Sequence, residues 1–128
     1  MSARPFADHP APEQRSGLDL IVLRTPVGLR FEPAADVEWL QADGNNVVFC
    51  IRGERVSMRM TLTNLESTLD PVRFLRISRS SIVNLGHVRQ ALFRNGGHYV
   101  FEMRSGQKLP SSRNRSRLIR RLGVRVRR

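Results

Sequence analysis

The sequence predicts a single, mainly β domain with one short helix in the middle of the chain and a basic helix near the C-terminus. Its apolar segments are short and rich in β-branched and aromatic residues, a composition that favours strands. Gly, Asn, Asp and Pro separate these segments at short intervals, as turns do. Only residues 62–69 and 111–122 space their apolar side chains as a helix does. A chain of 128 residues that is 40% hydrophobic can bury such a core.

The first part of the chain alternates strand and turn signals. A hairpin is expected around Asp43-Gly44-Asn45-Asn46, with a loop longer than the tightest two-residue type. A second turn is expected at residues 52–55. The strands expected in this part span residues 18–23, 27–31, 37–42, 47–51 and 56–60.

A short helix is expected next. Thr63 and Glu66, three residues apart, have the spacing of a capping box. Leu62, Leu65 and Leu69 recur at helical spacing before Pro71 ends the segment.

The second part of the chain returns to strands and closes with a helix. Strands are expected at residues 74–77, 82–83, 88–94, 99–104 and 107–109, with a hairpin across Asn95-Gly96-Gly97. Residues 111–122 are expected as a basic helix capped by Ser111 or Ser112. Its apolar stripe would consist of Leu118, Ile119 and Leu122.

The domain is expected to span residues 18–122, between a disordered leader at residues 1–17 and a basic tail at residues 123–128. The leader is rich in proline and too short to fold as a sensor or receiver domain. It lacks the apolar centre of a secretory signal, which favours a cytoplasmic protein. The single cysteine, Cys50, agrees with a reducing compartment, and its apolar strand predicts a buried structural role.

Charge is the most informative global property. The formal net charge is +11, and all but one of the 22 basic residues are arginine. Residues 1–69 are slightly acidic, whereas residues 70–128 hold 15 basic residues against only Asp70 and Glu102. A positive field this concentrated attracts polyanions. Nucleic-acid binding is therefore the leading interpretation.

Enzyme chemistry finds no support in the sequence. His9, His87 and His98 are scattered, and no Cys or carboxylate lies at metal-ligand spacing. The chain has no nucleophile elbow and no phosphate-cradling glycine loop, and its basic half has no paired carboxylates. We therefore expect no catalytic residues, no metal, no cofactor and no small-molecule substrate.

Three segments suggest nucleic-acid contacts. In residues 76–81, arginines alternate with hydroxyl residues that can bind phosphate. As a plain strand this segment would place Arg76, Ser78 and Ser80 on one face, with Arg79 on the other beside Ile77 and Ser81. Residues 111–117 are equally basic and hydroxyl-rich. The third segment is the Asn45-Asn46 turn, where the chain's need for a tight turn also explains the asparagines.

Together these segments resemble the LytTR DNA-binding domain family, the output modules of many bacterial response regulators. The matching stretches span residues 36–45, 60–66, 74–84 and 109–113, and the resemblance covers roughly residues 20–122. It implies elongated antiparallel β-sheets that insert loops, instead of a recognition helix, into successive major grooves of double-stranded DNA. It also implies direct-repeat sites occupied by two copies.

The resemblance assigns roles to particular residues. Base contacts are expected from Asn45, Asn46, Arg79 and Arg113. Backbone contacts are expected from Arg76, Ser78, Ser80, Ser112 and Arg115. The chain departs from the family's pattern at Ser78, where His is common, and at Asn46, where the family often has an aromatic residue or His. It is interpreted either as a stand-alone regulator or as an excised output domain.

Two other interpretations remain open at this point. The basic face could instead bind an acidic regulatory protein or an anionic membrane surface. RNA binding is less favoured because the chain has few aromatic residues on which bases could stack. Burial of Phe74, Phe93 and Phe101 would weaken it further.

Overall fold

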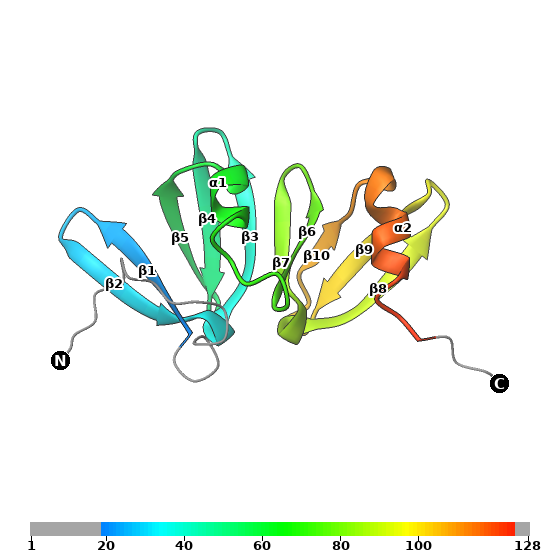
Figure 1. Ribbon diagram of the computed structural model, residues 1–128, viewed down its shortest axis with the longest axis horizontal. Coiled ribbons are helices and arrows are strands. Elements are labelled where there is room, and N and C mark those ends of the chain that lie inside the picture. Colours follow the sequence, from blue (N-terminus) through cyan, green and yellow to red (C-terminus); the bar gives the residue numbers. More distant parts are fainter. Residues whose placement is uncertain (1–18, 125–128) are drawn as a thin grey trace.

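The computed structural model describes residues 19–124, which form three antiparallel sheets arranged side by side along the long axis of the molecule (Figure 1). The first sheet pairs β1 (Leu20–Thr25) with β2 (Gly28–Pro33). The central sheet, in the order β5-β4-β3-β7-β6, contains β3 (Val37–Asp43), β4 (Asn46–Ile51), β5 (Glu54–Arg59), β6 (Phe74–Ser78) and β7 (Ser81–Asn84). The third sheet, in the order β10-β9-β8, contains β8 (Val88–Arg94), β9 (His98–Met103) and β10 (Lys108–Pro110).

Short helical segments connect these strands. They are η3 (Ala34–Asp36), α1 (Leu62–Glu66), η4 (Leu85–His87), η5 (Arg113–Arg115) and α2 (Ser116–Arg120). The predicted fold class, mainly β with antiparallel sheets and few short helices, is confirmed. The expected leader, residues 1–17, and residues 125–128 of the expected tail lie outside the described residues.

The central sheet is buried on both faces. Because neighbouring strand residues point to opposite sides of a sheet, Leu40 and Phe49 face one core while Trp39 and Cys50 face the other. The first core also takes in α1 and the first sheet, and the second is closed by the third sheet and α2. Burial raises the pKa of the Cys50 thiol, and the nearby Glu38 carboxylate adds to this. The predicted buried cysteine is confirmed.

The hairpin between β3 and β4 is tighter than predicted. Asp43 pairs with Asn46, which leaves Gly44 and Asn45 as a two-residue turn, so the expectation of a longer loop is wrong. Gly44 has φ +61°, a conformation that residues with a Cβ rarely adopt and that hairpin turns of this length assign to glycine. Asn45 therefore lies at the tip, while Asn46 is the first residue of β4.

The predicted capping box is also wrong. The N-cap of α1 is Thr61, whose Oγ1 accepts a hydrogen bond from the Asn64 N–H (3.1 Å), and Thr63 lies inside the helix. Glu66 does not turn back to the helix start, because its carboxylate accepts a hydrogen bond from Arg76. The predicted apolar face is confirmed, since Leu62, Leu65 and Leu69 are all buried (4%, 7% and 8% exposed).

The expected helix over residues 111–122 is only partly formed. The chain stays extended through Ser111, because the Ser111 N–H bonds to the Tyr99 carbonyl (2.7 Å) and continues the pairing of β10 with β9. The buried Ser111 hydroxyl accepts from the Tyr99 N–H, and the Ser112 hydroxyl donates to Asn114, so neither serine caps a helix with its side chain. Of the predicted stripe only Ile119 is buried; Leu118 and Leu122 are exposed.

The three sheets meet at a polar junction formed by η3 and η4. The amide nitrogen of the buried Asn84 side chain donates to the Ala34 and Val37 carbonyls (3.2 and 2.8 Å), and its oxygen accepts from the Gly86 N–H (2.9 Å). His87 Nε2 adds a contact to the Ala35 carbonyl (2.6 Å). Since η3 links the first sheet to the central one and η4 links the central sheet to the third, this junction connects all three.

An ion-pair network joins the first sheet to the β4–β5 turn. The nearly buried Glu32 carboxylate accepts hydrogen bonds from Arg52 (2.9 Å) and Arg30, and Arg30 also bonds to Glu54 (2.9 Å). Arg52 stands in the turn at φ +49°, and its bonds to Glu32 and Asp36 offset the strain of that conformation. The hydrogen bonds from Arg52 and Arg30 hold the pKa of Glu32 below its ordinary value.

We predict that Asn84→Ala lowers the free energy of unfolding by about 1–3 kcal/mol, because the carbonyl groups of Ala34 and Val37 lose a buried side-chain donor. Urea unfolding of the full chain measures the change. Asn64→Ala, at an exposed position of α1, is the control and should change stability by less than about 0.5 kcal/mol. Equal effects of the two substitutions would contradict the role of the junction.

Glu32 should make stability depend on pH. Its pKa is lower in the folded protein, so the unfolded chain binds the additional proton in acid. Its stabilisation is therefore complete above the ordinary Glu pKa of about 4.3 and is lost as the pH falls through the folded value. The difference in unfolding free energy between the native chain and Glu32→Gln should be largest near neutral pH and shrink below about pH 4. A constant difference across this range would contradict the prediction.

Candidate nucleic-acid interface

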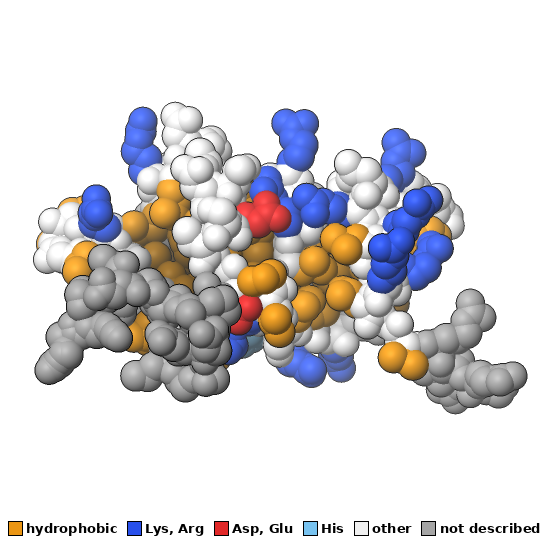
Figure 2. Space-filling model, in the orientation of Figure 1, with side chains coloured by type: hydrophobic (Ala, Val, Ile, Leu, Met, Phe, Trp, Pro, Cys, Tyr) orange, Lys and Arg blue, Asp and Glu red, His pale blue; other side chains and the backbone are white. Residues whose placement is uncertain are grey.

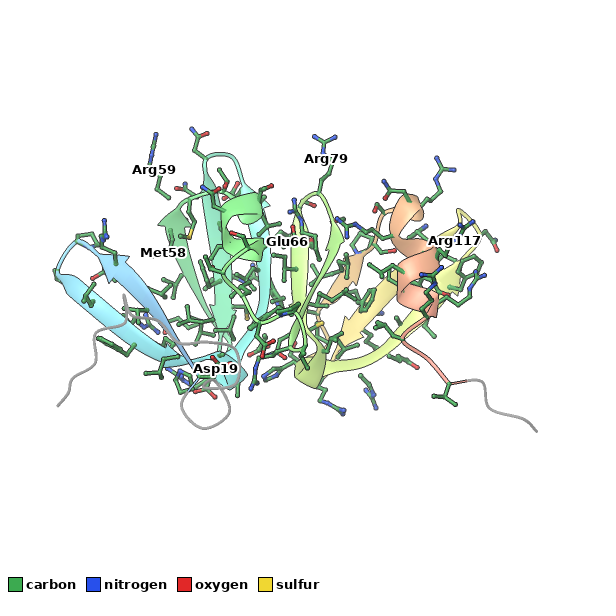
Figure 3. The ribbon with its side chains drawn as sticks, in the orientation of Figure 1. Asp19, Met58, Arg59, Glu66, Arg79 and Arg117 are labelled. Atoms are coloured by element: carbon green, nitrogen blue, oxygen red, sulfur yellow. The ribbon has the colours of Figure 1, made fainter. Side chains whose placement is uncertain are left out.

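The predicted contact segments lie along one edge of the molecule, the upper edge in Figures 1 and 3. We define this upper edge as the β3–β4 turn with Asn45 and Asn46, the β6–β7 turn with residues 78–80, and residues 112–115 before and within η5. The polar junction of η3 and η4 lies at the opposite, lower edge (Figure 1). Strands β3, β4, β6 and β7 run between the two edges, so they carry the turns away from the point where the sheets are joined.

The β6–β7 turn presents Arg79 to solvent. Ser78 pairs with Ser81, which leaves Arg79 and Ser80 as a two-residue turn, and the register shifts between Arg76 and Ser78. The expectation that Arg79 shares a strand face with Ile77 is therefore wrong: Ile77 is fully buried, whereas Arg79 is exposed and points out from the edge (Figure 3). The irregularity and the turn together break the alternation that a plain strand would impose.

Backbone hydrogen bonds tie the three segments of the upper edge together. The Ala42 N–H, just before the β3–β4 turn, donates to the Ser80 carbonyl (2.8 Å). The Ser112 N–H, just before η5, donates to the Ile77 carbonyl (2.9 Å), at the point where the β6–β7 register shifts. The β6–β7 hairpin is thus bonded to strand β3 on one side and to Ser112 on the other, and these backbone bonds restrain the spacing between Asn45, Arg79 and Arg113.

Arg76 faces inward on the protein. Its Nε and Nη2 donate to the carbonyls of Ser78 (2.8 Å) and Arg79 (2.7 Å), and its Nη1 donates to Glu66 (2.9 Å). Its side chain is only 11% exposed. The expected role of Arg76 as a backbone contact to nucleic acid therefore finds no support in its surroundings.

The hydroxyl residues of the turn are bonded to one another. Ser78 Oγ accepts from the Ser80 N–H (3.2 Å) and lies 3.3 Å from Ser80 Oγ. Ser80 is exposed and Ser78 is half-buried. The two hydroxyls therefore lie together beside Arg79, where a phosphate could replace their mutual contact.

Arg113 is exposed at the start of η5 and lies against the β8–β9 turn. A Cβ added to Gly97 would lie 3.4 Å from Arg113 Cδ, so the glycine leaves room for this side chain. The Ser116 hydroxyl donates to the Gly97 carbonyl (2.6 Å) and fixes α2 to the same turn. Arg115 is half-buried beside them.

The β3–β4 turn offers side-chain amide groups that have no partner among the described residues. Asn45 is exposed and Asn46 half-buried, and neither side chain bonds to another residue within the described part of the chain. Arg59, the last residue of β5, was not among the residues predicted from sequence; it pairs with Asn46 across the ladder. Figure 3 shows Arg59 pointing from the strand end in the same direction as Arg79. No sequence signal distinguishes it, because its place depends on strand register.

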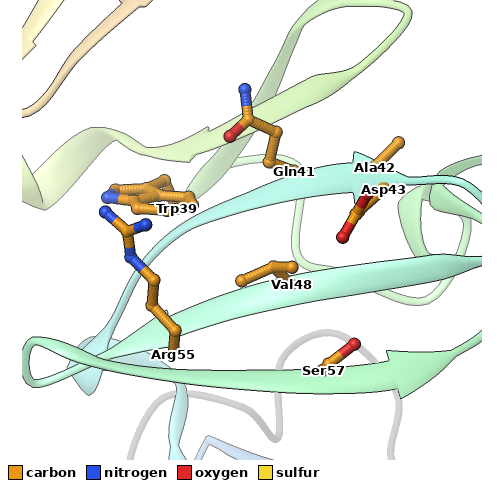
Figure 4. A pocket seen from close by; sticks show the side chains of 7 residues that line it. All are labelled: Trp39, Gln41, Ala42, Asp43, Val48, Arg55 and Ser57. Atoms are coloured by element: carbon orange, nitrogen blue, oxygen red, sulfur yellow. The ribbon is translucent and has the colours of Figure 1, made fainter.

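A shallow pocket of about 350 Å³ lies on the face of the central sheet that carries Trp39, next to the β3–β4 turn (Figure 4). Arg55 stacks over Trp39, with its guanidinium carbon 5.3 Å from the ring centroid, and bonds weakly to Gln107 (3.5 Å). The remaining lining residues are Gln41, Ala42, Asp43, Val48 and Ser57. Among residues 19–124, no three His, Cys, Asp or Glu side chains gather as a metal site would require.

Basic side chains also gather around α2, at the right of Figure 2. Arg117, Arg120 and Arg121 are exposed there, and the Arg120 guanidinium lies 5.8 Å from the centre of the Phe93 ring.

Phe74 and Phe101 are buried, as expected of core residues, whereas Phe93 is 54% exposed and in edge contact with Tyr99. Phe31 is also exposed (46%), so burial removes Phe74 and Phe101 as stacking platforms for unpaired bases but leaves the rings of Phe31 and Phe93 accessible. No helix within residues 19–124 is long and apolar enough to cross a membrane.

Comparison with known proteins gives consistent matches. The family model of the LytTr DNA-binding domain matches residues 28–123. The chain is 36% identical over 95 residues to the CO-responsive transcriptional regulator RcoM of Rhodospirillum rubrum, a match that covers 70% of this chain and 40% of that protein. The fold is similar to that of the LytTr DNA-binding domain of a putative methyl-accepting/DNA response regulator from Bacillus cereus. That similarity has a TM-score of 0.72 at 23% identity and covers 80% of this chain and 94% of the other.

Proposed function

The chain belongs to the LytTR DNA-binding domain family, and we propose that it regulates transcription by binding specific sites in double-stranded DNA through its upper edge. The observation that carries this proposal is the placement of Asn45, Arg79 and Arg113 on three segments that share one edge and are bonded to one another through the backbone. Turns held at fixed spacing can enter successive major grooves together, which separate flexible loops cannot do.

The exposed side chains of the edge match the chemistry of base edges. A guanidinium can donate two hydrogen bonds to guanine O6 and N7, and an asparagine amide can pair with adenine N6 and N7. Under the proposal, the loops enter successive major grooves of the DNA, where Arg79 and Arg113 read bases and Asn45 or Asn46 reads a third base position. Within residues 19–124 the side chains of Arg79 and Asn45 make no hydrogen bond to another residue, so contact with DNA breaks none there.

Phosphate contacts are proposed for the polar groups that flank these readers. They are Ser78, Ser80, Ser112, Arg115 and, in addition to the residues expected from sequence, Arg59. Such contacts position a protein on the duplex without reading sequence. Two copies on a direct-repeat site would place two such edges on one DNA segment. The domain would act in the cytoplasm without catalysis, cofactor or small-molecule substrate, and a regulatory protein partner is compatible with it.

The domain is also proposed to work as part of a larger regulatory mechanism. The chain spans 40% of the length of RcoM, and the response to CO is a property of that protein. The match covers 95 residues of a transcriptional regulator, so it supports a role in transcription regulation here and assigns no signal to this chain.

We predict that Arg79→Ala and Arg113→Ala each weaken binding to the preferred site by about 1–3 kcal/mol and relax the preference at different base pairs. Selection from random-sequence duplex DNA first defines the site, and affinities for single-base variants then locate each effect. Arg89→Ala, on an exposed residue near the lower end of β8, is the matched control and should leave base preference unchanged.

Two outcomes would contradict this proposal. If both variants weakened binding to all DNA sequences equally, the assignment of base readers would be wrong. If the native chain bound anionic phospholipid vesicles more tightly than duplex DNA at the same salt concentration, DNA would not be its ligand.

Arg59→Ala should behave differently from the base-reader variants. Loss of one phosphate contact releases one counterion fewer, so binding to all sequences should weaken alike and the slope of log K against log salt should become shallower by about 1. Titrations at several salt concentrations measure the slope, with Arg89→Ala again as control. A change in base preference, or a slope equal to that of the control, would show that Arg59 is not a phosphate contact.

A further inference from the structure

We infer that Arg76 is a positioning residue: it holds the β6–β7 turn in the conformation that presents Arg79, and Glu66 holds Arg76 in place. The inference rests on the proposed function, because it concerns how Arg79 is presented to a base. It departs from the expectation that Arg76 itself contacts DNA.

The contacts of the guanidinium define this role. Nε and Nη2 bind two successive positions of the turn, the carbonyls of Ser78 (2.8 Å) and Arg79 (2.7 Å), while Nη1 binds the Glu66 carboxylate (2.9 Å). Three nitrogens of one rigid, planar group therefore have three different partners. With 11% of the side chain exposed, Arg76 is enclosed by its own protein.

The turn needs such a restraint for a local reason. It contains only Arg79 and Ser80, and the ladder that leads into it changes register between Arg76 and Ser78. Regular pairing therefore does not continue evenly up to the turn. The bond to the Arg79 carbonyl restrains the peptide group that follows the Arg79 Cα, and with it the direction in which the Arg79 side chain leaves the edge.

Glu66 completes the arrangement from a separate element. It is the last residue of α1, which packs against β3 and β7, and its side chain is 44% exposed. The ion pair fixes the end of the guanidinium that does not bind the turn, and it balances the Arg76 charge so that this arginine adds little to the positive field of the edge. A free phosphate-binding arginine would have neither property.

The test compares base preference at two places on the same DNA site. Arg76→Lys keeps the charge but removes the planar fork that binds Ser78, Arg79 and Glu66 together. In the full chain we expect about a tenfold loss of preference at the base pair that Arg79→Ala identifies, the size typical of losing hydrogen bonds to a charged group. The preference at the base pair identified by Arg113→Ala and the salt slope should both stay unchanged. Glu66→Gln should cause a smaller loss at the same base pair.

The unchanged preference at the Arg113 position also shows that the variant is folded. A second measurement needs no variant: the Arg76 Nε–H signal in NMR spectra should exchange slowly in the free protein and keep its position when DNA binds. Protection that arises only in the complex would overturn the inference.

The remaining outcomes separate the inference from the proposal beneath it. If Arg76→Lys weakened binding to all sequences equally and reduced the salt slope, Arg76 would be a phosphate contact. If Arg79→Ala relaxed base preference and Arg76→Lys did not, the inference alone would fail. If Arg79→Ala left base preference intact, the proposed function of Arg79 would fail and the inference with it.

Discussion

The arrangement of the molecule depends on one buried amide, the side chain of Asn84. Three sheets that share no strand ladder meet where its nitrogen and oxygen bind the backbone of η3 and η4. Apolar packing alone is not directional and would allow the sheets to slide over one another. Hydrogen bonds with fixed geometry, reinforced by the contact of His87 with the Ala35 carbonyl, define one arrangement.

The upper edge depends on the same constraint at a distance. Strands leave the junction and reach the opposite edge, so any rotation of one sheet at Asn84 would displace a turn there. Two backbone bonds, from Ala42 to Ser80 and from Ser112 to Ile77, connect the turns a second time. An edge that is fixed at both ends of its strands keeps its spacing, which the proposed reading of several bases along a regular duplex would require.

Local sequence signals predicted the elements better than their ends. Patterns among residues a few positions apart in the sequence predicted the strands and the buried Cys50. They also predicted the apolar face formed by Leu62, Leu65 and Leu69. The cap of α1 and the loop length of the first hairpin did not follow. Both depend on the exact residue at which regular backbone bonding begins, and Asp43 pairs with Asn46 one step further than the turn signal indicated.

The sequence by itself determined the mainly β fold, the concentration of positive charge in the second half and the identity of the segments that form the upper edge. Only the tertiary structure decided how each arginine in them is bonded and exposed. Arg76 and Arg79 look equivalent in sequence, yet one is enclosed by three partners and the other is exposed. Arg59 lies beside Asn46 of this edge solely through strand register. The physical reason is that charge is a property of a residue, whereas its availability to a ligand depends on the groups that the fold places around it.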